Sequence, residues 1–423
     1  MREMKTMKIG RKLRLYSLLA TCLLTGSALH AQTAQTAISP EAAGLVEGNN
    51  HFALEIYREL ADEEATGNLF ISPWSITTAF GMAWAGARGE TADQMAEVLR
   101  FPTDQASNHA LFGELIATLN DIQEEGKLVL NTANAMWPTE GHTVLPEYAR
   151  ILDTYYDAHA ESLDYRNDTE GSRQRINGWV ADKTADRIKD LIARGVLSPV
   201  TAIVLTNAIY FKGAWQTLFD PEETVDAVFH ALDGSEIAVD MMRMREDLRF
   251  YEDDAVTMVT LPYHGEDLEA VLIAPRDGTV RELEASLTPE TLSSWLGQLE
   301  ETEDVLVRLP RFSLRYKAEL STVLKALGMR LPFSREAADF SGIFGAANLF
   351  ISSVLHETFL QVKEEGTEAA GATAIVIEVE SVNPMPTFNG NRPFLFLIRD
   401  KVTGSLLFMG RVAAPEPIED ETA

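Results

Sequence analysis

The feature that most constrains the fold is a nearly continuous apolar run in the middle of the chain. Residues 203–205 and 208–211 are apolar and rich in β-branched and aromatic side chains. A strand that is apolar on both sides is usually covered on both faces, so we expect residues 203–211 to form a central strand of a large sheet. The chain must then place further layers on both faces of that sheet.

Helical patterns dominate the first part of the chain, and strand patterns dominate the later part. Ser72 followed by Pro73 is typical of a helix start, and Thr91 with Gln94 three residues later predicts a capping box for the next helix. Apolar spacing predicts a helix over 320–327, whereas strands are predicted over 258–263, 268–274, 394–398 and 406–409. The expected class is therefore α+β.

The N-terminus has the layout of a secretory signal peptide. Six basic residues precede an apolar stretch from Leu15 to about Leu24, and small residues then lead to Ala31. The apolar run is about half of the ~20 residues that a membrane span needs. We therefore expect residues 1–31 to be a signal peptide and the protein to be secreted or periplasmic. A lipoprotein anchored at Cys22, the one cysteine of the chain, is an alternative.

The rest of the chain is predicted to form one large domain. Residues 32–48 are small and polar and are interpreted as a linker, and residues 416–423 as an acidic tail. Between them, residues 49–415 contain no internal repeat, no second apolar span and no proline- or glycine-rich linker. No membrane-spanning segment is expected there.

Composition excludes several classes of function. The chain has 64 acidic and 36 basic residues, so a nucleic-acid partner is not expected. Motifs for metal, nucleotide or nucleophilic serine chemistry are absent from the sequence, and the histidines are scattered. We therefore expect no cofactor, no metal, no catalytic residue and no enzymatic activity, although a triad assembled only in space stays open.

One segment near the C-terminus has an unusual composition. After Gly366 the chain is first small and then β-branched, and only Glu368 is charged up to Ile377. If this segment is a strand, Thr367, Ala369, Gly371 and Thr373 share one uncharged face that could fit between two existing strands. An ordinary strand with a glycine entry is the alternative interpretation. Small residues bury little apolar area and therefore make a weakly held strand. Such a segment could occupy either of two positions in the fold.

That segment resembles the hinge of an inhibitory serpin. Blocks elsewhere fit the same family in order, over about residues 45–415. They are residues 68–75, 86–91, 205–215, 339–342, 354–356, 392–396 and 408–412, and the hinge itself is Glu364, Glu365, Gly366, Thr367, Glu368, Ala369, Ala370, Gly371, Ala372 and Thr373. We identify the chain as a suspected serpin of prokaryotic type.

The resemblance implies the serpin fold, with three β-sheets, eight to nine helices and an exposed reactive-centre loop over about 364–386. Family spacing puts the scissile bond at Glu380-Ser381, where a shift of a residue or two is open. The residues that control sheet opening carry over to Ser72, Ser75, Asn207 and His356, and Trp215 carries over to the point where the loop enters the sheet. All five roles are structural, not catalytic.

The implied function is that of a monomeric suicide inhibitor of serine proteases. The cleaved loop would insert into the largest sheet and trap the acyl-enzyme. Glu380 predicts a protease that accepts glutamate, and Val379 and its neighbours suit an elastase-like or subtilisin-like enzyme; some cysteine proteases are also possible targets. Residues 107–123 lack lysine and arginine, so heparin is not expected as a partner. A non-inhibitory carrier or chaperone is the alternative.

Overall fold

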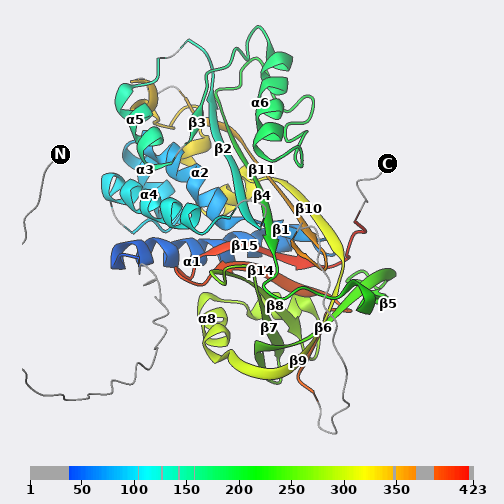
Figure 1. The fold of residues 1–423 in the computed structure, drawn as a ribbon. Helices are drawn as coiled ribbons and strands as arrows, with labels where there is room; N and C mark the ends of the chain where they lie inside the picture. Colours follow the sequence, from blue (N-terminus) through cyan, green and yellow to red (C-terminus); the bar gives the residue numbers. More distant parts are fainter. Residues whose placement is uncertain are drawn as a thin grey trace, which may run out of the picture. The chain divides into compact units, whose positions relative to one another are not determined.

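The structure is a computed structural model of the 423-residue chain. It describes residues 38–418, except residues 103, 125–126, 142, 157, 346–348 and 368–384. Figure 1 shows the order of the elements, with α1 (Pro40–Glu63) lying between the helices that follow it and strands β14 (Phe394–Asp400) and β15 (Leu406–Val412).

The described residues contain ten α-helices, where eight to nine were expected. After α1 they are α2 (Pro73–Gly86), α3 (Gly89–Val98), α4 (Gln105–Asp121), α5 (Pro146–Tyr155), α6 (Thr169–Lys183), α7 (Val280–Ser286), α8 (Pro289–Gln298), α9 (Ser321–Ala326) and α10 (Ser341–Phe344). Helix α1 also includes residues 40–48, so the expectation of a linker is wrong for these residues. Ser39 caps it by accepting from the Ala42 amide, and Pro40 occupies its first turn.

A six-stranded sheet lies at the centre. Its main path runs in the order β10 (Phe312–Glu319), β11 (Ile351–Val362), β4 (Ile203–Ala214), β2 (Leu128–Pro138) and β3 (His159–Ala160). Strands β11 and β4 pair directly and in parallel from Ile351 to Phe359 of β11, and this register puts His356 opposite Asn207. The short strand β12 (Gly366–Thr367) pairs antiparallel with the end of β4.

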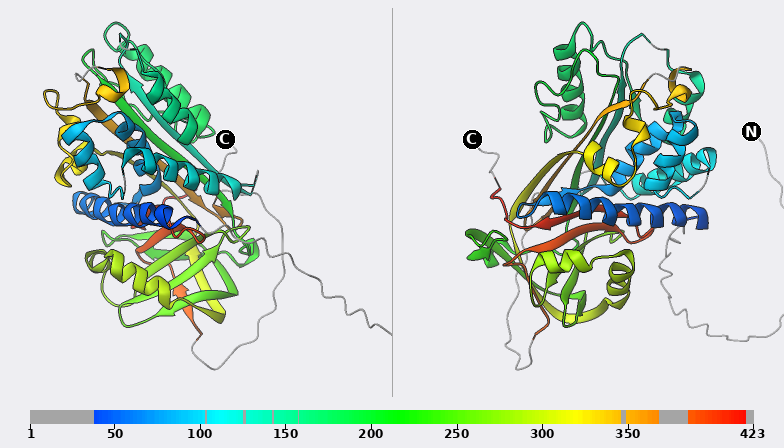
Figure 2. Two further views of the ribbon diagram at one scale, coloured as in Figure 1. Left: turned by 90° about the vertical axis from the view of Figure 1, so that its left-hand side faces the viewer. Right: turned by 180° about the vertical axis from the view of Figure 1, so that it is seen from behind.

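Strand β4 is covered on both faces, as its apolar run predicted. Leu205 and Ile209 belong to the main core with α2, whereas Val204 and Ala208 pack with Ile176 and other side chains on the α6 side. Figure 2 shows α6 on one face of this sheet and the α2–α4 helices on the other. The predicted central strand over 203–211 is therefore confirmed.

The second sheet has nine strands. Its path is β1 (Leu69–Ile71), β15, β14, β8 (Leu268–Pro275), β7 (Val256–Pro262), β6 (Glu236–Glu252), β9 (Glu300–Pro310) and β13 (Thr387–Asn389), with β5 (Val225–His230) paired to β6. The described residues thus form two hydrogen-bonded sheets, where three were expected. The 17-residue strand β6 joins what would be two sheets, because it pairs with β5 and β9 and, at its end, with β7.

Helix α2 begins as predicted, but α3 does not. Ser72 caps α2 by accepting from the Ser75 amide. Helix α3 begins at Gly89, two residues before the expected cap at Thr91. Thr91 instead accepts from the backbone amide of Asp339, and Gln94 accepts from two amides at 330 and 331. Contacts between distant segments have replaced the local capping box.

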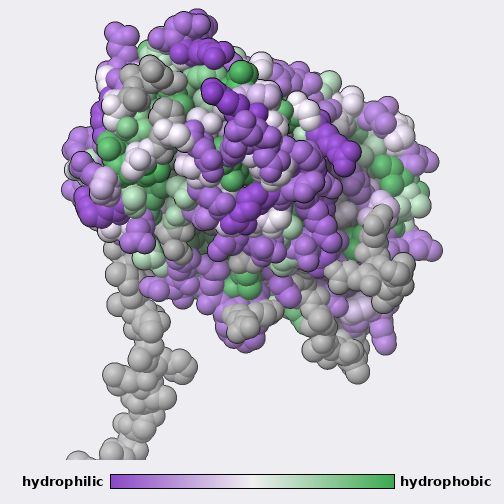
Figure 3. Space-filling view, turned by 90° about the horizontal axis from the view of Figure 1, so that it is seen from above, coloured by the Kyte–Doolittle hydropathy of each residue, from purple (hydrophilic) through white to green (hydrophobic). Residues whose placement is uncertain are grey.

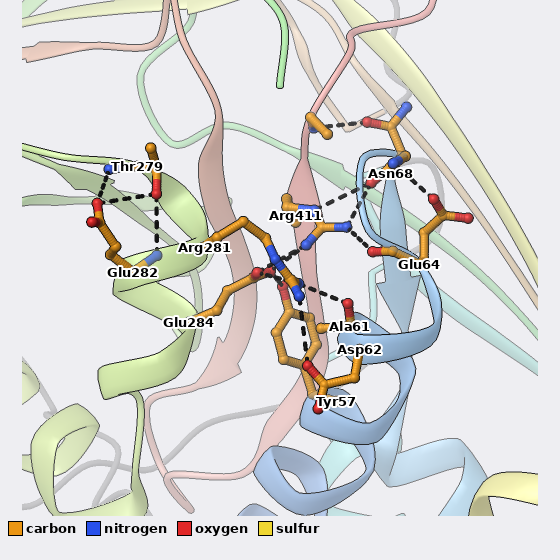
Figure 4. A network of polar contacts seen from close by, with 12 residues as sticks. Tyr57, Ala61, Asp62, Glu64, Asn68, Thr279, Arg281, Glu282, Glu284 and Arg411 are labelled. Carbon is orange, nitrogen blue, oxygen red and sulfur yellow. Dashed lines mark hydrogen bonds and ion pairs between the residues drawn. The ribbon is translucent and has the colours of Figure 1, made fainter. Parts of the chain in front are cut away.

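A buried ion pair fixes the loop that leads into β1 (Figure 4). The Arg411 guanidinium of β15 is fully buried and donates to both carboxylate oxygens of Glu284, each at 2.8 Å. It also donates to the carbonyls of Glu64 and Gly67, and the Tyr57 hydroxyl donates to Glu284 at 2.6 Å. Burial, and then Glu284, raise the pKa of Tyr57 well above its usual value. The network thereby ties α1, α7 and β15 together.

The C-terminal segment reaches back to the edge of the central sheet. The backbone amide of Ser313 donates to the carbonyl of Glu416 at 2.9 Å, so the first residues of the expected tail are paired to β10. The face of the molecule in Figure 3 is mostly hydrophilic, with apolar side chains in small separate groups. Among the described helices, none is both long enough and apolar enough to cross a membrane.

Candidate functional site: the sheet junction and the loop entrance

Four predicted site residues meet beneath the junction of β4 and β11. Ser72 and Ser75 lie at the start of α2, Asn207 lies in the middle of β4, and His356 lies opposite it on β11. All four are at most 1% exposed. The structure therefore brings together side chains from three segments that the sequence separates by up to 284 positions.

The hydrogen bonds of this cluster use both nitrogens of His356. Its Nδ1–H donates to the Asn207 side-chain oxygen, and its Nε2 accepts from the Ser72 backbone amide at 3.2 Å. Asn207 donates in turn to the Ser75 hydroxyl at 2.6 Å. The Ser72 hydroxyl donates to the Leu407 carbonyl at 2.7 Å. Each polar group that the cluster buries thus has a partner, as a stable interior requires.

His356 is neutral in this arrangement. Burial lowers the pKa of its imidazole from 6.5 to about 3, and the contact with Asn207 only partly offsets that shift. A proton on Nε2 would also face the Ser72 amide, which is itself a donor. The network therefore holds β4 and β11 together only while His356 stays uncharged.

Asn134 is a member of this cluster that the sequence did not reveal. It lies on β2, opposite Asn207 in the strand register. Its side-chain oxygen accepts from Asn207 at 2.7 Å and from the Ser75 hydroxyl at 2.9 Å. The only signal in the sequence is that Asn134 is one of three polar residues in a largely apolar strand, and this does not say which strand lies opposite.

Trp215 marks the other end of the same pair of strands. It follows β4, is 3% exposed, and stacks on Tyr263 with ring centroids 4.6 Å apart. Its indole N–H donates to the Lys363 carbonyl at 3.0 Å, and its backbone amide donates to the Glu365 carbonyl at 3.0 Å. Trp215, which the resemblance assigns to the point of loop entry, thus contacts the backbone at Lys363 and Glu365.

The first hinge residues are bound at this entrance. Glu364 is 5% exposed, accepts from the Thr224 hydroxyl at 2.7 Å, and lies 3.4 Å from the Arg311 guanidinium. Thr367 is fully buried, and its hydroxyl is 2.9 Å from that of Tyr263. The Thr224, Tyr263 and Arg311 contacts were not predicted, because only the folded chain brings these residues to the hinge.

Gly366 is required by the close approach of the hinge to β4. Its backbone φ is +145°, a value that residues with a Cβ rarely adopt. A Cβ at this position would lie 2.2 Å from the Gly213 carbonyl oxygen and 2.6 Å from the Ala214 Cα. Glycine is therefore the residue that lets β12 pair with β4 here.

The remaining predicted site residues lie outside the described residues. They are the later hinge residues Glu368, Ala369, Ala370, Gly371, Ala372 and Thr373, together with the expected reactive bond Glu380-Ser381. Their roles stay predictions. Within the described part of the chain, no group of three or more histidine, cysteine, aspartate or glutamate residues could hold a metal ion.

Comparison with known proteins identifies the family. The family model described as serpin (serine protease inhibitor) matches residues 47–415. An uncharacterised serpin-like protein of Thermococcus kodakarensis is 37% identical over 377 residues, covering 88% of this chain and 86% of the relative. Mouse antithrombin-III is 38% identical over 382 residues, covering 88% and 82%. The structure of human thyroxine-binding globulin complexed with thyroxine has a TM-score of 0.80, 30% identity, and coverage of 89% and 100%.

The chain therefore belongs to the serpin family. The predicted serpin fold is confirmed, with the sheet and helix counts corrected as above. The family is described as one of serine protease inhibitors, which are generally not enzymes, and a globulin named for binding thyroxine also shares its fold. Relatives occur in archaea and in mammals.

Proposed function

We propose that this serpin is a suicide inhibitor of serine proteases. In this proposal a protease cleaves Glu380-Ser381, and the loop that begins at Gly366 inserts between β4 and β11 before the acyl-enzyme can hydrolyse. The observation that carries the proposal is the pairing of Gly366 and Thr367 with the end of β4. The hinge thus already lies at the end of the β4–β11 junction that it would have to open.

The state of the central sheet supports the same function. Strands β4 and β11 are hydrogen-bonded to each other directly along the junction, and the buried cluster around His356 closes it from below. Insertion would exchange this contact for a new strand with a full set of backbone hydrogen bonds, which releases the energy for trapping. The uncharged face of Thr367, Ala369, Gly371 and Thr373 suits that position.

The finer details of the proposal concern partners and location. We propose a target protease that accepts glutamate, of elastase-like or subtilisin-like type, and an exported protein that meets it outside the cytoplasm. Helix α4 has no lysine or arginine, which supports inhibition without heparin.

The test is to mix the protein with a panel of serine proteases and to resolve the products by SDS electrophoresis. We expect an SDS-stable complex and a released peptide that begins at Ser381. Thr373→Arg puts a charge on the inserting face and should turn the protein into a plain substrate. Ala372→Arg, on the opposite face, is the matched control and should still form the complex. Cleavage of the wild-type protein without complex formation by every protease would refute the proposal.

A carrier function is the second candidate, and a pocket favours it. The pocket has a volume of about 640 Å³ and is lined by residues of α1, α8 and the turn before β15, among them Leu54, Leu292 and Thr403. The two functions differ in what loop cleavage does. An inhibitor should gain thermal stability after cleavage because the loop inserts, whereas unchanged stability would favour the carrier.

A further inference from the structure

A pocket of about 360 Å³ lies on the nine-stranded sheet, on the strands next to the end of the reactive loop. Strands β5, β6 and β9 and the segment around β13 line it. Its charged lining residues are Arg243 of β6 and Arg308 of β9, and Asn389 and Asn391 line it beside them. No carboxylate lines this pocket among the described residues.

The two arginines lie directly opposite each other. The strand register pairs Arg243 with Arg308, and it pairs Arg308 on its other side with Asn389. Like charges at directly opposed positions of neighbouring strands destabilise a sheet. Because the chain has 64 acidic residues, a carboxylate partner could readily have been placed there, and the uncompensated pair calls for a functional reason.

Neighbouring arginines are compensated. Arg245, two residues along β6, forms an ion pair with Asp304, and Arg311 of the following segment is 3.7 Å from Asp240. Within the described residues, Arg243 and Arg308 form no ion pair, and the Nε–H of Arg243 is buried without an acceptor. The acids Asp226 and Asp240 line a separate pocket.

The lining also suits a side chain rather than a bare ion. Val225 and Val228 of β5, which are 45% and 43% exposed, are apolar lining residues of the pocket. The two asparagines add side-chain amide groups that can donate to a carboxylate. Two guanidiniums and two amides with an apolar wall can bind the carboxylate of an aspartate or glutamate together with its aliphatic stem.

We propose that this pocket is a docking site for an acidic side chain on the surface of the target protease. The inference rests on the proposed inhibitory function. Asn389 follows Ser381 by eight residues, a span of at most about 29 Å of extended chain. A protease bound at the expected reactive bond would therefore place its own surface within reach of the pocket. In a strongly acidic inhibitor, this local positive site would orient the protease.

The first experiment measures the pocket without any protease. The peptide Ac-Glu-Asp-Glu-NH₂ is titrated by calorimetry into the full-length protein and into Arg243→Gln/Arg308→Gln. We expect the wild type to bind at least about tenfold more tightly, with an affinity that salt lowers, and the neutral peptide Ac-Gln-Asn-Gln-NH₂ not to bind. Arg245→Gln/Arg276→Gln is the matched control, because it removes the same charge from arginines that already have carboxylate partners.

The second experiment measures the rate of SDS-stable complex formation with a protease that the wild type traps. We expect Arg243→Gln/Arg308→Gln to slow association about tenfold and the control variant to leave the rate near that of the wild type. Equal peptide binding by the wild type and the arginine variant, or equal association rates, would overturn the proposal. Peptide binding that appears only in Glu378→Gln/Glu380→Gln would also overturn it, because the chain's own loop would then fill the pocket. If no protease forms a complex, the inhibitory function fails, whereas the peptide titration still decides whether the pocket binds carboxylates.

Discussion

Acid should open the junction between β4 and β11 through His356. In the closed sheet, burial lowers the pKa of His356 from 6.5 to about 3. When the strands part, water reaches the imidazole and its pKa returns toward its ordinary value. The open state then binds a proton that the closed state does not bind, so the closed sheet loses relative stability as the pH falls below 6.5, down to about 3.

The size of the effect follows from the pKa difference. At pH 4.5 the solution is two pH units below the ordinary pKa and still above the lowered one. Each unit is worth about 1.36 kcal/mol, so the closed state loses about 2.7 kcal/mol relative to pH 7.5. The population of the open junction should therefore rise by up to about 100-fold.

The assay is the rate at which a synthetic peptide with the sequence of residues 367–380 enters the sheet. We expect faster incorporation into the wild type at pH 4.5 than at pH 7.5, and a nearly flat response in His356→Gln, which cannot be protonated. His109→Gln is the matched control. His109 of α4 is also buried, with a pKa lowered to about 4, but it contacts Tyr156 and not the junction. An acid response of His356→Gln equal to that of the wild type would contradict a role for this imidazole.

Three further predictions concern the buried Arg411–Glu284 ion pair, the hinge and export. Arg411→Ala leaves the Glu284 carboxylate with only the Arg281 guanidinium and the Tyr57 hydroxyl as partners and should cost about 3 kcal/mol by chemical unfolding. Arg411→Met/Glu284→Leu/Tyr57→Phe also removes the buried carboxylate and hydroxyl and should recover part of that loss, and equal losses would contradict the role of the pair. Gly366→Ala should detach β12 from β4, because its Cβ would collide with the Gly213 carbonyl, and the hydrogen-exchange protection of the Thr367 amide should fall at least about tenfold; unchanged protection would contradict this. Expression of the full chain in a secreting bacterium should give a mature N-terminus at Gln32 by mass spectrometry, unchanged in Cys22→Ser; an acylated N-terminus at Cys22 would favour the lipoprotein.

The elements that the sequence predicted best carry a strong local signal. The apolar run of β4 has one physical solution, burial on both faces, and Ser72-Pro73 caps α2 in the way that its residue types favour. Residues 258–263 and 268–274 likewise form neighbouring antiparallel strands. In these cases the local preference and the fold agree.

The errors occurred where tertiary contacts override the local pattern. The small residues of 40–48 suggested a linker, but Gly48 is small because α1 packs against the 100-region: a Cβ there would lie 2.3 Å from the Arg100 carbonyl oxygen. Thr91 and Gln94 have the spacing of a capping box and serve distant backbone amides instead. Asn134 joins the buried cluster only through the register of β2 on β4, which no local pattern encodes.

The direction of the strands at the junction has a consequence for the energy of insertion. Strands β4 and β11 are parallel, and β12 already runs antiparallel to β4 after a tight turn at Lys363–Gly366. A strand that continues from β12 between them would be antiparallel to both neighbours. One slanted parallel ladder would be replaced by two perpendicular antiparallel ladders, which are somewhat more stable per residue. Strands β4 and β11 are thus the neighbours between which an added strand would improve the hydrogen-bond geometry on both sides.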